Sequence, residues 1–111
     1  MITVHIPVPP STNGLFANIP GRGRIKSERY RAWLVVAGTE LNLQRPKAVN
    51  GPVSVDLMMK RPNGSSDIDN RIKAALDLLV LHRLIDDDKK VVDVRARWGA
   101  VEDCIVTVRA A

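Results

Sequence analysis

Cysteine and histidine are scarce in this chain of 111 residues, which contains one Cys and two His. A single cysteine excludes an internal disulfide and a cysteine-rich zinc site, and two isolated histidines make a poor metal site or catalytic triad. Aromatic residues are also few, at 4% of the sequence. No apolar run approaches the length of a membrane span, and no charged segment followed by an apolar run stands at the start. We therefore expect a cytoplasmic protein with no membrane partner.

The composition is that of a folded globular protein, with 45% hydrophobic and 26% charged residues. The length fits a single domain, which we place at residues 1–111. Lys and Arg number 17 against 12 Asp and Glu, so the formal net charge is +5. This charge favours an acidic partner such as nucleic acid.

Apolar periodicity divides the chain into alternating strands and helices. Helical spacing predicts one helix that follows the N-cap Ser27 and ends near residues 42–46, and a second from Asp69 to His82. Residues 11–26 are rich in turn formers and predict a basic loop. Period-two alternation predicts strands at residues 2–6, 53–59, 92–98 and 104–108. The expected fold is α/β (α+β), with order β-α-β-α-β-β and a mixed sheet of about four strands on which both helices pack.

Two short acidic segments stand out in this basic chain. Asp67 and Asp69 open the second predicted helix, and Asp86-Asp87-Asp88 follows that helix. Carboxylates are ligands that hard divalent cations prefer. Lys73 lies four residues after Asp69 on the same helical face, so its ammonium can lie beside the ion without being a ligand. This combination predicts phosphodiester cleavage, in which the ion activates the attacking water and the lysine stabilises the transition-state charge.

Each part of this pattern also has a purely structural explanation. Asp is a common N-cap, and acidic residues in a first turn complement the helix dipole. Asp86 to Asp88 alone would be typical of a solvated loop, and Lys73 with Asp77 of an exposed i,i+4 pair. Cys104 alternates with apolar residues, which predicts a buried, unreactive thiol. Only the combination of the acidic segments and the lysine indicates catalysis.

The assembled pattern resembles the RusA family of Holliday-junction resolvases over nearly the whole chain. The similar segments are Pro9-Pro10-Ser11-x-Asn13, Arg61-Pro62, Asp67-x-Asp69-Asn70-x-x-Lys73-Ala74-x-x-Asp77 and Asp87-Asp88-x-x-Val91-Val92-Asp93. The resemblance implies that Asp67, Asp69 and Asp88 are the essential metal-binding aspartates. It also implies that Lys73 is the catalytic lysine and that Asp87 matches an adjacent acidic position.

The resemblance further implies the activity and the partners. It predicts an endodeoxyribonuclease that depends on Mg²⁺, with Mn²⁺ able to substitute, and that acts as a homodimer. Such an enzyme would nick four-way DNA junctions in pairs during recombination and repair. Family members are often encoded by phages and prophages, so the expected location is the cytoplasm of a bacterial host or phage-infected cell. Two other functions stay open, namely a basic DNA-binding phage protein that lacks the chemistry and a nuclease that acts on other branched DNA.

DNA binding is predicted for the densest basic cluster of the chain, because cationic side chains that contact phosphates release counterions. Members of the family can carry an arginine run just before the first aspartate, but Asn63-Gly64-Ser65-Ser66 stands there in this chain. The basic cluster must then supply more of the phosphate contacts. Its members are Arg22, Arg24, Lys26, Arg29 and Arg31.

The predicted second helix also bears on how the site is assembled. A helix from Asp69 to His82 rises about 20 Å at about 1.5 Å per residue, and the segment from His82 to Asp88 can return at most about 20 Å if fully extended. A site made within one chain is therefore only marginally reachable. We expect Asp88 of one chain to meet Asp67 and Asp69 of its partner in the dimer.

Overall fold

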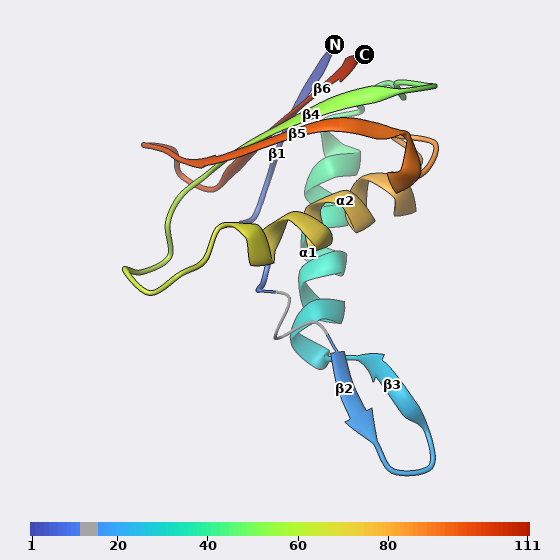
Figure 1. Ribbon diagram of the computed structural model, residues 1–111, viewed down its shortest axis with the longest axis vertical. Coiled ribbons are helices and arrows are strands. Elements are labelled where there is room, and N and C mark those ends of the chain that lie inside the picture. The colour runs from blue at the N-terminus through green and yellow to red at the C-terminus, as the bar shows by residue number, and fades with distance from the viewer. Residues whose placement is uncertain (12–15) are drawn as a thin grey trace.

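A four-stranded mixed sheet forms one layer of the protein, and both main helices lie on the same side of it (Figure 1). The structure is a computed structural model that describes residues 1–11 and 16–111, so Asn13 lies outside the described residues. The strand order is β1-β6-β4-β5, with β4 parallel to β5 and antiparallel to β6. This confirms the predicted mixed α+β sheet. The strands are β1 (Ile2–Ile6), β4 (Val53–Met59), β5 (Val91–Trp98) and β6 (Cys104–Ala110).

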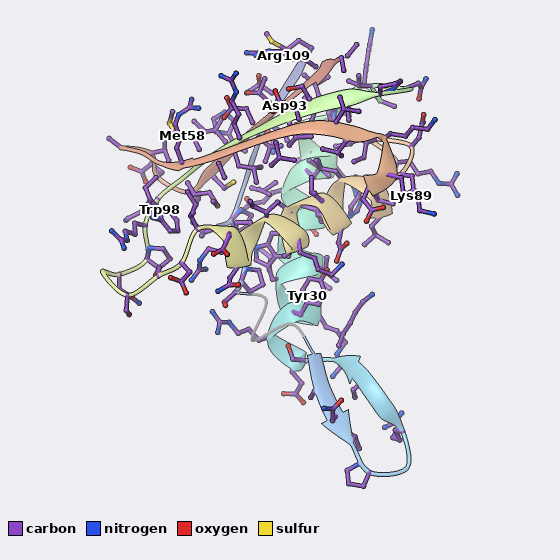
Figure 2. The ribbon with its side chains drawn as sticks, in the orientation of Figure 1. Tyr30, Met58, Lys89, Asp93, Trp98 and Arg109 are labelled. Atoms are coloured by element: carbon purple, nitrogen blue, oxygen red, sulfur yellow. The ribbon has the colours of Figure 1, made fainter. Side chains whose placement is uncertain are left out.

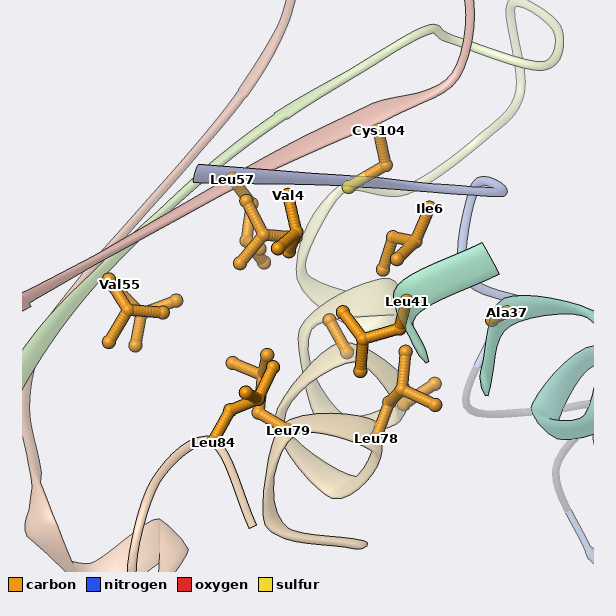
Figure 3. Packing of buried hydrophobic residues seen from close by; sticks show 14 of the residues in the cluster. Val4, Ile6, Ala37, Leu41, Val55, Leu57, Leu78, Leu79, Leu84 and Cys104 are labelled. Carbon is orange, nitrogen blue, oxygen red and sulfur yellow. The ribbon is translucent and has the colours of Figure 1, made fainter. Parts of the chain in front are cut away.

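The central strand β4 has the bounds that its alternating pattern predicts. Val53, Val55, Leu57 and Met59 are fully buried, whereas the residues between them are partly exposed. One face of the strand therefore points at the helices and the other at solvent, as expected for a sheet covered on one side. Figure 3 shows the resulting core between the sheet and the helices, with Leu78 and Leu79 packed beneath the strands.

The first helix, α1 (Glu28–Leu43), begins where the sequence predicts. The Ser27 hydroxyl accepts a hydrogen bond from the Tyr30 backbone N–H at 3.1 Å, which satisfies one of the free donors of the first turn. The residues at helical spacing that were expected in the core are buried, among them Tyr30, Trp33 and Leu41. Cys104 is buried too, as predicted.

The second helix is shorter than its periodic pattern suggests. A 3₁₀ turn, η2 (Asp69–Arg71), precedes α2 (Ile72–Leu81), which crosses α1 in Figure 1. His82 follows as the C-cap, and a Cβ placed on Gly38 of α1 would lie 2.6 Å from its Nε2 atom. His82 therefore packs against Gly38 of α1. In the part of the chain that the structure describes, no helix is long and apolar enough to cross a membrane.

Residues 11–26 differ from the predicted loop. The described part contains an antiparallel hairpin made of β2 (Phe16–Ile19) and β3 (Gly23–Lys26), which projects from the start of α1 away from the sheet (Figure 1). Gly21 and Gly23 have φ values of 78° and 72° in its turn, a conformation that favours glycine. Strands of four residues are too short for periodicity to distinguish them from loop, which is why the prediction was wrong here.

Strand β5 contains a second departure from the sequence pattern. Val53 pairs with Val91 and Ser54 with Asp93, so Val92 is an extra residue in a bulge. Val92, expected to begin this strand, is 64% exposed, and the strand begins one residue earlier, at Val91. Register irregularities of this kind depend on the partner strand and leave no mark on the pattern of a single strand.

Candidate active site

Asp67 and Asp69 lie on an exposed rim just before α2. The Asp67 carboxylate accepts a hydrogen bond from Asn70 Nδ2 at 3.3 Å, and Asp69 begins the 3₁₀ turn. The loop that leads to them is held by its own side chains. Arg61 donates to the Gly64 carbonyl at 3.0 Å, and Asn63 Oδ1 accepts from the Ser65 backbone N–H at 3.0 Å. The two carboxylates are thus presented to solvent from an ordered edge.

Lys73 takes part in a short polar chain on the side of α2. Its ammonium lies 3.5 Å from Asp77 Oδ1, and the Tyr30 hydroxyl donates to Asp77 Oδ2 at 2.9 Å. Burial raises the pKa of Tyr30, and the Asp77 carboxylate raises it further. The tyrosine therefore remains a hydrogen-bond donor that fixes Asp77, while Lys73 itself is exposed. The i,i+4 pair expected from the sequence is present.

The later acidic segment has divided roles. Asp86 accepts from the Gly51 backbone N–H at 2.8 Å, which ties it to the turn before β4. Asp87 caps the short 3₁₀ helix η3 (Asp88–Lys90) by accepting from the Lys89 backbone N–H at 3.2 Å. A hydrogen bond between the two neighbouring carboxyl groups raises the pKa of Asp88, and the positive charge of Lys73 opposes the rise.

Asp88 borders an open hollow of about 290 Å³ whose other lining residues include Lys26, Tyr30 and Asp77. Figure 2 shows Lys89, its neighbour in sequence, beyond the C-terminal end of α2. Asp88 thus lies on the side of the molecule reached by the end of α2, near Lys73 and the end of β3.

One chain does not bring the predicted metal ligands together. Asp67 and Asp69 precede α2 and Asp88 follows it, and the two ends of this ten-residue helix lie on opposite sides of the molecule in Figure 1. The ten residues of α2 rise about 15 Å at about 1.5 Å per residue, and the chain after the helix turns back only far enough for Asp88 to come within range of the charge of Lys73. Among residues 1–11 and 16–111, no group of three or more Asp, Glu, His or Cys side chains is placed to hold a metal ion.

The predicted DNA-binding residues form one continuous region, which we call the basic arm: Arg22, Arg24, Lys26, Arg29 and Arg31. Arg22 is exposed in the hairpin turn, and Arg29 and Arg31 are exposed on the first turn of α1. The Lys26 ammonium lies 6.0 Å from the centre of the Tyr30 ring. Arg24 belongs to β3, but its side chain lies outside what the structure describes.

Arg71 is the residue of this region that sequence reasoning missed. Its side chain is 8% exposed, and Nη1 donates to the Pro9 carbonyl at 2.7 Å. Burial lowers the pKa of Arg71, and the nearby charge of Arg29 lowers it further. The sequence spacing could have predicted that Arg71 is buried. It stands three and four residues before the core residues Ala74 and Ala75, and residues at that spacing share one face of a helix.

Exposed carboxylates, a nearby lysine and a basic arm together are typical of proteins that cut nucleic acid. The family model described as Endodeoxyribonuclease RusA matches residues 7–109, and the chain belongs to this family. RusA proteins are nucleases that act on Holliday junctions, so the class of activity is endonucleolytic cleavage of DNA. Among curated proteins, no sequence matches the chain significantly.

Proposed function

We propose that the protein is a Mg²⁺-dependent endonuclease that resolves four-way DNA junctions as a homodimer, by paired nicks, in recombination and repair. The observation that carries this proposal is the family match across residues 7–109, which contains all four residues expected to act. The location proposed for this activity is the cytoplasm of a bacterial host or of a phage-infected cell.

The proposed metal ligands are Asp67 and Asp69 of one chain with Asp88, and Asp87 beside it, of the partner. All four are exposed carboxylates, and hard oxygen donors of this kind suit Mg²⁺ or Mn²⁺. When bound, the ion would supply Lewis-acid chemistry and favour ionisation of the attacking water. The carboxylates of this chain would hold and orient that centre.

The dimer is proposed because a single chain separates the carboxylates. A two-fold axis beside α2 would bring the partner's η3 segment over the start of α2, and would place the second half-site symmetrically at the other end. Two sites of this kind fit a reaction that makes paired, symmetric nicks. The proposal is supported by the described part of a single chain, in which Asp67, Asp69 and Asp88 do not form a group placed to hold a metal ion.

Lys73 is proposed to stabilise the charge that develops on the phosphate oxygens. In the described part of the chain its ammonium pairs with one carboxylate, Asp77, at 3.5 Å, and the lysine side chain is 52% exposed. An exposed i,i+4 pair stabilises by only about 0.3–0.5 kcal/mol, so a DNA phosphate can draw the ammonium away from Asp77.

The direct test is cleavage of a synthetic four-way junction in Mg²⁺, with EDTA as the metal-free control. We expect paired nicks that EDTA abolishes. Asp67→Asn, Asp69→Asn and Asp88→Asn should each abolish cleavage, and they should bind the junction as tightly as the parent or more tightly, because repulsion between carboxylates and phosphates is relieved. Binding without cleavage by the parent protein would support a DNA-binding role instead. Equal cleavage of flaps or forks would support a broader branched-DNA nuclease.

The shared site has its own test in mixed dimers. Asp67→Asn and Asp88→Asn chains are each inactive as homodimers, but a heterodimer would contain one site with every carboxylate intact. We expect mixing and re-equilibration to restore nicking, with one working site per heterodimer. If heterodimers form, as shown by mass spectrometry of differently tagged chains, and no nicking returns, the site is built within one chain.

A further inference from the structure

A second hollow, strongly polar, opens beside Asp67 at the N-terminal end of α2, whereas the Asp88 hollow lies along the C-terminal half of that helix. Its volume is about 320 Å³. It lies between the start of α1, the loop before Asp67 and the 3₁₀ turn η2. Two arginines and several neutral polar side chains line it, namely Arg29, Arg71, Asn63, Ser65, Ser66 and Asn70.

Arg71 enters this hollow as a buried cation that the protein only partly satisfies. Nη1 donates to the Pro9 carbonyl at 2.7 Å, but Nε is buried without a hydrogen-bond partner among the described residues. A buried donor without a partner is destabilising, and more so when it belongs to a charged group. The position therefore carries a free donor that points to a ligand.

This arginine pair also forms no salt bridge in the described part of the chain. The salt bridges within the described part of the chain join Lys73 to Asp77 and Arg97 to Asp56, and neither involves Arg29 or Arg71. The two guanidinium groups are close enough for Arg29 to disfavour the charge on Arg71. An anion between them would relieve the repulsion and accept from the free N–H at once.

A phosphate group is the anion that matches these donors best. Guanidinium groups present N–H donors in a fork that fits phosphate oxygens. The Ser65 and Ser66 hydroxyls already donate to Asn63 Oδ1, at 2.7 and 3.2 Å, so the two arginines are the donors that would hold the anion. Asp67 also lines the hollow, so the anion would sit next to a proposed metal ligand. A phosphodiester has two charged oxygens that could accept from both arginines, and a metal ion held by Asp67 would offset the repulsion between the phosphate and that carboxylate.

We propose that Arg29 and Arg71 bind a backbone phosphodiester of the DNA strand in this hollow, next to the phosphate that is cut. The assignment of DNA as the ligand rests on the proposed function. It gives Arg71 a role in positioning the strand, and it supplies phosphate contacts beside a loop, Asn63 to Ser66, that carries no cationic side chain.

The test measures junction binding in EDTA, where no cleavage occurs, at a series of salt concentrations. Arg29→Gln and Arg71→Gln should each weaken binding and reduce the slope of log affinity against log salt by about 0.9, the value expected for one lost phosphate contact. Arg109→Gln is the matched control, because Arg109 lies at the far end of β6 near the C-terminus (Figure 2). It should leave the slope close to that of the parent.

Two further variants and a modified DNA guard against misfolding as an explanation. Arg71→Lys keeps the charge but loses the fork of donors, so affinity should fall while the slope stays near the parental value. Arg29 is exposed, so Arg29→Gln should fold normally by circular dichroism. Replacing the contacted phosphate of the junction with one neutral methylphosphonate should weaken binding by the parent protein. The same replacement should not change binding by Arg29→Gln, which has already lost that contact.

The outcomes separate this site from the proposed function. An unchanged salt slope in both glutamine variants overturns the phosphate site. Protection of the parent against heat by millimolar inorganic phosphate, lost in both variants while their DNA slopes are unchanged, would assign the hollow to free phosphate and also overturn it. Reduced slopes in a protein that fails to cut junctions in Mg²⁺ would keep the phosphate site and refute the proposed function.

Discussion

Tyr30→Phe should lower stability and leave catalysis nearly intact, whereas Lys73→Met should lower catalysis and leave stability nearly intact. Both side chains nevertheless contact the same carboxylate, that of Asp77. Asp77 receives the Tyr30 hydroxyl at 2.9 Å on one oxygen and faces the Lys73 ammonium at 3.5 Å on the other. The two partners differ in burial, and burial decides how much each contact contributes.

The expected magnitudes follow from that difference. Tyr30 is 1% exposed and donates to a charged acceptor, so its loss should lower the free energy of unfolding by about 1.5–3 kcal/mol. The Lys73 and Asp77 side chains are 52% and 32% exposed, so their ion pair should contribute about 0.3–0.5 kcal/mol. Lys73→Met should therefore be nearly neutral for stability.

The cleavage rate should fall more in Lys73→Met than in Tyr30→Phe. Removing a group that stabilises transition-state charge typically slows the chemical step by about 100-fold or more. Lys73→Met should show this loss in single-turnover cleavage of a saturated four-way junction, whereas Tyr30→Phe should retain most of the rate at a temperature where it is folded. Urea denaturation followed by circular dichroism gives the stabilities. Lys47→Met, at an exposed lysine in the loop after α1, is the matched control.

Two results would refute this reasoning. If Lys73→Met is destabilised as much as Tyr30→Phe, the lysine is a structural partner of Asp77. If it cuts junctions as fast as Lys47→Met, it does not stabilise the transition state, whatever its effect on stability.

Two further variants test the packing. Burial raises the pKa of Cys104 from 9.0 to about 12. The stability that the protonated thiol contributes is therefore complete below pH 9 and is lost as the pH rises towards 12. In urea denaturation between these pH values, the free energy of unfolding of the parent should fall by about 1.4 kcal/mol more per pH unit than that of Cys104→Ala. Gly38→Ala would place a Cβ 2.6 Å from His82 Nε2, and the overpacking cost of about 1–3 kcal/mol is offset by the roughly 1 kcal/mol that alanine gains over glycine inside a helix, so thermal denaturation should show a net loss of at most about 2 kcal/mol. Gly64→Ala, with open space around it, should show no loss. Parallel pH profiles, or equal effects of the two alanines, would contradict these expectations.

The elements that the sequence predicts well are those in which local signals agree. In β4, alternating burial and flanking turn residues fix both ends, and in α1 the Ser27 cap and the apolar face fix the start. The short strands of the hairpin, the 3₁₀ turn at Asp69 and the bulge at Val92 lack such agreement. Their conformations depend on pairing and on neighbouring elements, which single-chain periodicity does not contain.

The same distinction holds for the candidate site. The order of Asp67, Asp69 and Lys73 is a matter of local spacing, so it could be predicted from the motif. The separation of Asp88 from the first two depends on where the chain turns after α2. The polar hollow depends on a contact between Arg71 and Pro9, which are 62 positions apart in the sequence. No local pattern predicts such a contact, and for that reason Arg71 was missed.

The crossing of the two helices explains how one short segment serves both hollows. Arg29 lines the hollow beside Asp67, and the next residue, Tyr30, lines the hollow beside Asp88. Successive residues of an α-helix point about 100° apart, so adjacent positions at the start of α1 can line two different hollows. The basic arm thereby contributes Lys26 to the hollow beside Asp88 and Arg29 to the hollow beside Asp67. A DNA strand held by the arm would meet carboxylates at either end of the helix, which is the arrangement that a two-fold dimer with shared sites requires.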